Sequence, residues 1–333
     1  MAWLAFLGKE LVNTMKKILS ISLMFILAWM LPIIGSANTE LARFAEKGLV
    51  DQVSHLLEQN VDVNSRLNDG STALHWAVLR DQHHAADILV EAGADPLALN
   101  RNGISPLFLA VQNGNEGIVS LLLDAGADPN TLSENGETLL MTASHTGKPE
   151  VVSLLLESGA LIDARDPDFK QTALMIAVRE GHVEVVNNLI RYGAKVDAQT
   201  RIGADVVYLP PCKGTGCGSE GVGINRSGVP HRGERFDRKG GMTSLLYAAR
   251  DGHAESARLL LKNGADLEIA EANKITPLLM ALLNNQLEVA YMLLDFGAEV
   301  NVEDFYGRNP LFAAVDYRNL DMNSDLEDDP QDN

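Results

Sequence analysis

The sequence of 333 residues is poor in aromatic side chains, cysteine and positive charge. Aromatic residues make up 5% of it, so its core must consist mainly of Leu, Ala, Val and Ile. It has 27 Lys and Arg against 45 Asp and Glu, a formal net charge of −18. A chain this acidic is repelled by nucleic-acid phosphates and anionic membrane surfaces. The charge therefore argues against nucleic-acid binding, and it indicates either a basic partner or simple solubility.

The sequence also lacks the short motifs that carry enzyme chemistry. The glycines of residues 214–223 precede no predicted helix and no Lys-Ser or Lys-Thr pair, so a phosphate-binding loop is not expected. There is no Gly-x-Ser-x-Gly nucleophile elbow. Asp and Glu are numerous, but they fall in predicted turns and on solvated helix faces. We therefore expect no catalytic residue, no bound metal and no cofactor.

The N-terminal segment has the pattern of an export signal. Met15-Lys16-Lys17 is a short basic start, residues 18–34 are almost entirely apolar, and Gly35-Ser36-Ala37 supplies the small residues of a cleavage site. We expect residues 1–37 to be a signal peptide, with translation starting at Met15, and the mature protein to be periplasmic or secreted. The alternative is an uncleaved membrane anchor, although the apolar run is near the lower length limit for spanning a bilayer. No Cys follows the run, which argues against a lipoprotein anchor.

A repeat of about 33 residues runs through most of the remaining chain. Seven similar strings such as Thr72-Ala73-Leu74-His75 start at intervals of 33, 33, 34, 71, 33 and 33 along the chain, and an Ala lies five positions after each start. The starts are Thr72, Ser105, Thr138, Thr172, Thr243, Thr276 and Asn309. The starts and their alanines form one ladder, that is, a set of equivalent positions in successive repeats. A second ladder with the same period consists of Gly93, Gly126, Gly159, Gly193, Gly264 and Gly297. Two independent ladders with one period indicate a stacked repeat architecture.

Each repeat predicts a pair of helices. The leading Thr or Ser can cap the first helix, which stabilises it by about 1 kcal/mol. The Leu and Ala that follow lie on one face, where the small Ala lets neighbouring helices approach. A Leu-rich second helix such as residues 118–123 ends at the ladder glycine, which adopts the left-handed conformation without steric cost.

This pattern resembles the ankyrin repeat, on strings such as Thr276-Pro277-Leu278 and turns such as Gly93-Ala94-Asp95. The resemblance covers about residues 39–317 apart from one insertion. It implies an all-α solenoid of about seven helix-turn-helix repeats plus a C-terminal half-repeat, with β-turn fingers. It also implies a monomeric, non-catalytic protein that binds another protein. The departures are mild: the family's His is kept only at His75, and Lys170 and Lys274 replace the glycine of two fingers.

The predicted repeat domain spans residues 38–318. Residues 39–64 form an atypical first repeat, in which Asn60 stands at the ladder position. After Asn309 we predict a first helix without a second, followed by an acidic, disordered tail at residues 319–333. The missing helix leaves an apolar face uncovered. The tail covers it, a partner covers it, or the chain is a shortened form of a longer one.

The long spacing marks an insertion at about residues 202–240. Subtracting one repeat interval of 33 from 71 leaves 38 extra positions, which include nine glycines and carry six Lys and Arg against four Asp and Glu. Three readings stay open: an inert loop, a basic partner-binding arm beside the concave groove that fingers and first helices form in this family, or a metal or redox site. Cys212, Cys217 and His231 would supply only three of the four ligands that zinc requires. A local disulfide between Cys212 and Cys217 is the simpler expectation in an oxidising compartment.

Candidate binding residues follow from the resemblance, because fingertips and first-helix ends usually face the partner in ankyrin proteins. Aromatic and Arg side chains dominate binding hot spots. The candidates on this basis are Phe169, Arg179, Arg250, Tyr306 and Tyr317, together with Arg101, Gln112 and His145. The first-helix ends nominated by position also include Glu180 and Asp251. The alternative is that most of them are solvated surface residues. The leading hypothesis is a non-catalytic scaffold that binds a partner protein through the concave groove, the fingers and the inserted loop. One alternative is an inhibitor, immunity or envelope-stress support protein that masks a basic partner. The other is a metal or redox site in the insertion that carries Cys212 and Cys217.

Overall fold

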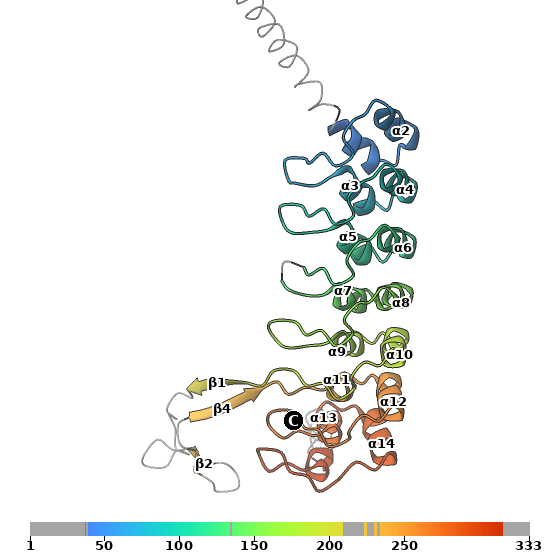
Figure 1. Cartoon of the computed structure of the whole chain (residues 1–333). Helices are drawn as coiled ribbons and strands as arrows, with labels where there is room; N and C mark the ends of the chain where they lie inside the picture. Colours follow the sequence, from blue (N-terminus) through green and yellow to red (C-terminus); the bar gives the residue numbers. More distant parts are fainter. Residues whose placement is uncertain are drawn as a thin grey trace, which may run out of the picture. The chain divides into compact units, whose positions relative to one another are not determined.

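The computed structural model of the chain describes residues 37, 39–133, 135–208, 223–224, 230–231 and 234–315. The chain divides into two compact units, Met1–Glu134 and Asn135–Asn333. Within the described residues, each unit is a stack of helix pairs joined by long loops (Figure 1). The all-α repeat fold expected from the sequence is confirmed.

The first unit contains two full helix pairs and an N-terminal pair. Residues 39–46 are helical, and the labelled helices are α2 (Val50–Glu58), α3 (Ala73–Leu79), α4 (His83–Glu91), α5 (Pro106–Asn113) and α6 (Glu116–Asp124). Helix α3 packs against α4 and α5, whereas α4 also packs against α2 and α6. First helices and second helices therefore form two layers.

The second unit repeats this arrangement. Its helices are α7 (Leu139–Thr146), α8 (Pro149–Glu157), α9 (Ala173–Arg179), α10 (Val183–Arg191), α11 (Ser244–Asp251), α12 (Ala254–Lys262), α13 (Pro277–Leu283) and α14 (Leu287–Asp295). Helices α7, α9, α11 and α13 pack in sequence in the first layer, and α8, α10, α12 and α14 pack in sequence in the second. Residues 310–315 form a last short helix.

The two sequence ladders have the predicted structural roles. The capping side chains accept a hydrogen bond from the backbone N–H three residues later, at 3.1–3.4 Å, and they are Ser105, Thr138, Thr172, Thr243 and Thr276. The ladder alanines are 0% exposed from Ala77 to Ala281. The ladder glycines have φ between 84° and 95°, and Asn60 takes the left-handed conformation with φ 57°.

The insertion extends a finger and leaves the stack of helices intact. The Thr200 N–H donates to the Met242 carbonyl at 3.0 Å, as the Asn100 N–H donates to the Ile104 carbonyl in an ordinary finger. Beyond this closure, β1 (Gly203–Tyr208) pairs antiparallel with β4 (Glu234–Lys239), and β2 (Gly223–Ile224) pairs with β3 (Pro230–His231). Helix α9 still packs on α11, and α10 still packs on α12. The sequence did not predict this strand pairing.

Several expectations fall outside the described residues. They are the signal peptide apart from Ala37, the disulfide between Cys212 and Cys217, and the tail at 319–333. These expectations stay predictions. In the part of the chain that the structure describes, no helix has the length and apolar character needed to cross a bilayer.

Candidate functional site

A connected group of polar and aromatic side chains lies at the first-helix ends of the second unit. We call it the first-helix network. Its members are His145, Gln171, Arg179, Glu180, Tyr247, Arg250 and Asp251. Five of them were nominated for binding from the sequence, namely His145, Arg179, Glu180, Arg250 and Asp251.

Glu180 connects the ends of two neighbouring first helices. Its Oε1 lies 3.4 Å from Nδ1 of His145, at the end of α7. The same oxygen accepts hydrogen bonds from Arg179 Nε at 3.2 Å and from Arg179 Nη2 at 3.1 Å. One carboxylate thus orients both an imidazole and a guanidinium.

Arg179 extends the network to the next repeat through Gln171. Arg179 Nη1 donates to Gln171 Oε1 at 3.3 Å, and Gln171 Nε2 donates to the Tyr247 hydroxyl at 2.8 Å. Gln171 precedes α9, and Tyr247 lies in α11. The bond between them links residues on either side of the insertion.

Arg250 closes the network on α11. Its guanidinium carbon lies 4.9 Å from the centroid of the Tyr247 ring, which is the geometry of a cation–π contact. Its Nε and Nη2 donate to the two carboxylate oxygens of Asp251 at 2.8 and 2.9 Å. These bonds raise the pKa of Arg250, because the carboxylate favours the charged guanidinium.

Hydrogen bonds from the following repeat hold the first-helix ends in place. His182 Nε2 donates to the carbonyl of His145 at 3.1 Å, and His253 Nε2 donates to the carbonyl of Arg179 at 3.1 Å. Gly147 leaves room for the first of these rings, since a Cβ there would lie 2.5 Å from ring atoms of His182. These hydrogen bonds hold the backbone of His145 and Arg179, two members of the network, in place.

The charged side chains of the network are partly open to solvent. The exposed fractions are 37% for His145, 31% for Arg179, 38% for Glu180 and 39% for Arg250. Such a surface can offer hydrogen bonds and an aromatic face to a partner. Among the described residues there is no group of three His, Cys, Asp or Glu that could hold a metal ion.

Phe169 and Tyr306, two other nominated residues of the second unit, lie on fingers and are not members of this network. Phe169 is 66% exposed on a finger whose turn is held by Asp166 Oδ1, which accepts the N–H groups of Asp168 and Phe169. Tyr306 is on the last finger, in edge-to-face contact with Phe305 at 5.6 Å. Arg101 and Gln112 are exposed in the first unit. Tyr317 is outside the described residues.

The sequence did not single out Gln171 or Tyr247 as site residues. Tyr247 holds a position that is Leu109, Ile176 or Met280 in other repeats, and it is 6% exposed. A tyrosine at a repeat position that is mostly apolar could have been recognised in the sequence as a candidate for a specific hydrogen bond. Gln171 had no comparable signal, because its role depends on a tyrosine 76 residues away.

The comparison with protein families decides what this arrangement is. A family model described as ankyrin repeats (3 copies) matches residues 41–133, 125–200 and 245–326, which is more than half of the chain. The chain belongs to the ankyrin-repeat family. Ankyrin repeats are generally protein–protein interaction modules, and their fold is typically a non-catalytic scaffold.

Solved structures include a clear relative in fold. The chain is similar to the crystal structure of the human ASB11 ankyrin repeat domain, with 25% sequence identity and a TM-score of 0.58. The match covers 78% of this chain and 98% of that one. Among the curated proteins, none matches this chain.

Proposed function

We propose that this ankyrin-repeat protein is a non-catalytic scaffold that binds a partner protein through the first-helix network. As accessory contacts we include the finger that carries Phe169 and the insertion at 202–240 in this proposal. The observation that carries the proposal is the network itself, in which one continuous set of contacts runs from His145 to Asp251.

The composition of the network suits a binding hot spot. Arg and Tyr are enriched among residues that contribute most to protein interfaces. Arg179 and Arg250 are also held by carboxylates before any partner arrives. Binding then requires less loss of side-chain freedom than binding by unrestrained arginines.

The acidity of the chain favours a partner with a basic surface. The formal charge of −18 attracts positive surfaces, and salt screens this attraction and so reduces its range. The same charge is the basis of a narrower candidate, an inhibitor or immunity protein that masks a basic partner. Affinity for such a partner falls steeply between low and high salt, whereas an apolar interface leaves it nearly unchanged.

Substitution of Arg250 and Arg179 tests the proposed surface, with an arginine outside the network as the control. The protein is immobilised, incubated with an extract of its source organism, and the captured proteins are quantified by mass spectrometry. We expect Arg250→Ala and Arg179→Ala to reduce capture of the specific partner by about tenfold. The control is Arg258→Ala on α12, because Arg258 also pairs with a nearby carboxylate, Glu255, at 3.6 Å, but lies in the second-helix layer.

Undiminished capture by the Arg250→Ala and Arg179→Ala proteins would contradict the proposed surface. Capture that Arg250→Ala and Arg258→Ala reduce equally would also contradict it, because Arg258 lies in the second-helix layer, outside the network. Repeating the capture at low and high salt separates the basic partner from an apolar one.

Export of the protein is a further part of the proposal. The basic start, apolar run and small residues before Asn38 support it. N-terminal sequencing of the protein purified from its source should give a chain that begins at Asn38. A chain that retains residues 18–34 would support the membrane-anchored alternative.

A further inference from the structure

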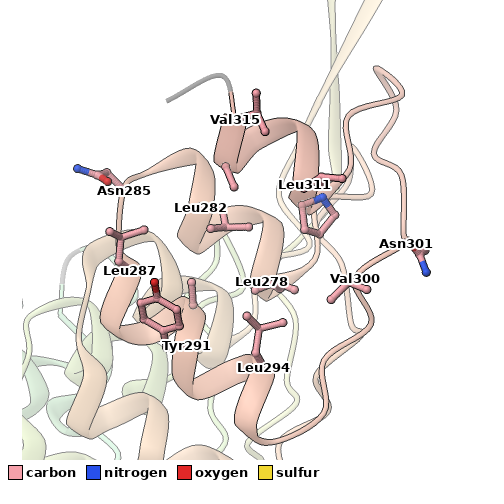
Figure 2. Close-up of a pocket in the computed structure, with 13 residues that line it drawn as sticks. Leu278, Leu282, Asn285, Leu287, Tyr291, Leu294, Val300, Asn301, Leu311 and Val315 are labelled. Atoms are coloured by element: carbon pink, nitrogen blue, oxygen red, sulfur yellow. The ribbon is translucent and has the colours of Figure 1, made fainter. Parts of the chain in front are cut away.

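The second unit ends in an apolar hollow of about 640 Å³. Leu278 and Leu282 of α13 line it, as do Tyr291 and Leu294 of α14 (Figure 2). Leu311, on the short last helix, completes the wall. The hollow lies at the position that a second helix of the last repeat would occupy, against α14 and the helix of residues 310–315.

Comparison with the preceding repeats shows that this face is uncovered. Leu311 is 72% exposed, whereas the corresponding residues Leu278 and Leu245 are 1% and 0% exposed. Leu294 on α14 is 41% exposed, whereas Leu261, one repeat earlier, is 7% exposed. The difference arises because α14 packs on α12, and no second-layer helix follows α14 among the described residues.

The sequence beyond Val315 continues the register of the repeat. The residues of α12 that are completely buried are Ser256, Ala257 and Leu260, and Val289, Ala290 and Leu293 take these places in α14. Advancing by the same interval once more gives Met322, Asn323 and Leu326. The family match also extends to residue 326, the last of these positions.

We propose that residues 320–328, the register equivalent of α14, fill this hollow as the outer helix of the last repeat, which replaces the expectation that the whole of residues 319–333 is disordered. In this arrangement Met322 and Leu326 pack against α14 and against the short helix of residues 310–315. The segment also carries four acidic residues, Asp321, Asp325, Glu327 and Asp328. A terminal repeat needs a polar outer face for solubility, and this acidic segment provides one. The proposal does not depend on the first-helix network.

The length and position of the chain favour this occupant over another molecule. Val315 is the last described residue and itself lines the hollow, so the following segment starts at its edge. Helix α13 ends at Leu283, and α14 begins four positions later, at Leu287. The same spacing from residue 316 leads to Leu320, where the proposed helix begins.

Hydrogen–deuterium exchange on the full-length protein tests the proposal. Amides of Leu287–Asp295 should exchange about tenfold faster in Met322→Asp/Leu326→Asp than in the unsubstituted protein, because α14 loses its cover. Truncation after Val315 should have the same effect. The matched control, Ser324→Asp/Gln331→Asp, adds the same two negative charges without removing an apolar side chain, and should leave this exchange unchanged.

Unchanged exchange in both the truncated and the Met322→Asp/Leu326→Asp proteins would overturn the proposal. So would a full-length dimer that Leu311→Asp dissociates and truncation preserves, because a second copy would then cover the hollow. Circular dichroism measures the helix content of each variant. Only variants whose helix content matches that expected for their length enter the comparison, so that global unfolding is not mistaken for the loss of the cover of α14. Sedimentation velocity at the concentration of the exchange experiment supplies the oligomeric state.

Discussion

A single histidine connects two repeats of the first unit. His75 is 2% exposed, its Nδ1 accepts the Thr72 N–H at 3.2 Å, and its Nε2 donates to the Ile104 carbonyl at 3.0 Å. This pattern requires the neutral ring, because both nitrogens cannot carry a proton while Nδ1 accepts. Burial lowers the pKa of His75, and the positive charge of Arg66 adds to this, although the Ile104 carbonyl and Asp69 oppose it.

The protonation of His75 should make stability depend on pH. Since the pKa is lower in the folded state, the unfolded state binds the proton more readily as the pH falls below about 6.5. Stability is therefore complete above this pH and is lost below it, by at most about 1.4 kcal/mol per pH unit. Urea unfolding of the wild type and of His75→Met at pH 7.5 and 5.5 measures the difference.

His75→Met is the suitable variant because Met141 and Met175 hold the same position in other repeats. The loss of stability between the two pH values should be smaller in His75→Met than in the wild type. The other histidines are the same in both proteins, so any contribution from them cancels in this comparison. Equal losses would mean that His75 does not contribute to the pH dependence.

Lys274 adopts a backbone conformation that suits glycine. Its φ is 63°, at the finger position where other repeats have Gly103 and Gly307. A left-handed non-glycine residue costs about 1 kcal/mol. We therefore expect Lys274→Gly to raise the free energy of unfolding by about that amount, measured by urea denaturation. Lys262→Gly in α12 is the control, and it should lower the stability by a similar amount.

At the scale of elements, the base of the β1–β4 hairpin depends on close backbone packing. Gly240 has φ 102°, and a Cβ at this position would collide with the carbonyl oxygen of Arg201. The Gly240 carbonyl also accepts the Ala272 N–H at 3.0 Å, which joins the finger to the next one. The hairpin therefore leaves the stack through a site that only glycine fits.

Gly240→Ala should destabilise this junction more than a substitution at an open finger glycine. Gly307 has φ 72° and no heavy atom within 4 Å of the place that a Cβ would take, so Gly307→Ala should cost only about 1 kcal/mol. Gly240→Ala must in addition displace the Arg201 backbone, whose N–H donates to the Phe169 carbonyl at 2.8 Å. Urea denaturation of the two variants compares their stabilities, and equal losses would show that the junction adapts without cost.

The repeat elements could be predicted from sequence because their signals are local. A cap, a Leu, an Ala and a terminal Gly fix each helix pair within a single repeat. The pairing of β1 with β4 joins segments that residues 209–233 separate in the sequence, and it has no such local signal. The network was predicted except for Gln171 and Tyr247, for a related reason. Helical position placed Arg179 and Arg250 at first-helix ends, but the choice of Gln171 and Tyr247 as partners depends on packing between repeats.

At the scale of the whole molecule, the repeat stack of the second unit tolerates an insertion because the insertion enters at one point. Helix packing continues from α9 to α11 and from α10 to α12, and Thr200 and Met242 close the finger. The chain between Thr200 and Met242 exceeds that of an ordinary finger by the whole insertion, since the repeat interval here is 71 instead of 33. Stability and partner binding should therefore be separable by removing this segment.

Deletion of residues 203–240 should restore an ordinary finger. It leaves Thr200-Arg201-Ile202-Gly241-Met242, which aligns with Asn100-Arg101-Asn102-Gly103-Ile104, and Gly241 already has φ 73° against 70° for Gly103. We expect the free energy of unfolding to change by less than about 1 kcal/mol, because loop length contributes weakly to stability. Deletion of residues 203–239 retains Gly240 and puts the finger out of register, so it should be the less stable protein. If the in-register deletion keeps its stability but loses the partner, the insertion is a binding arm, and if it keeps both, the insertion is inert.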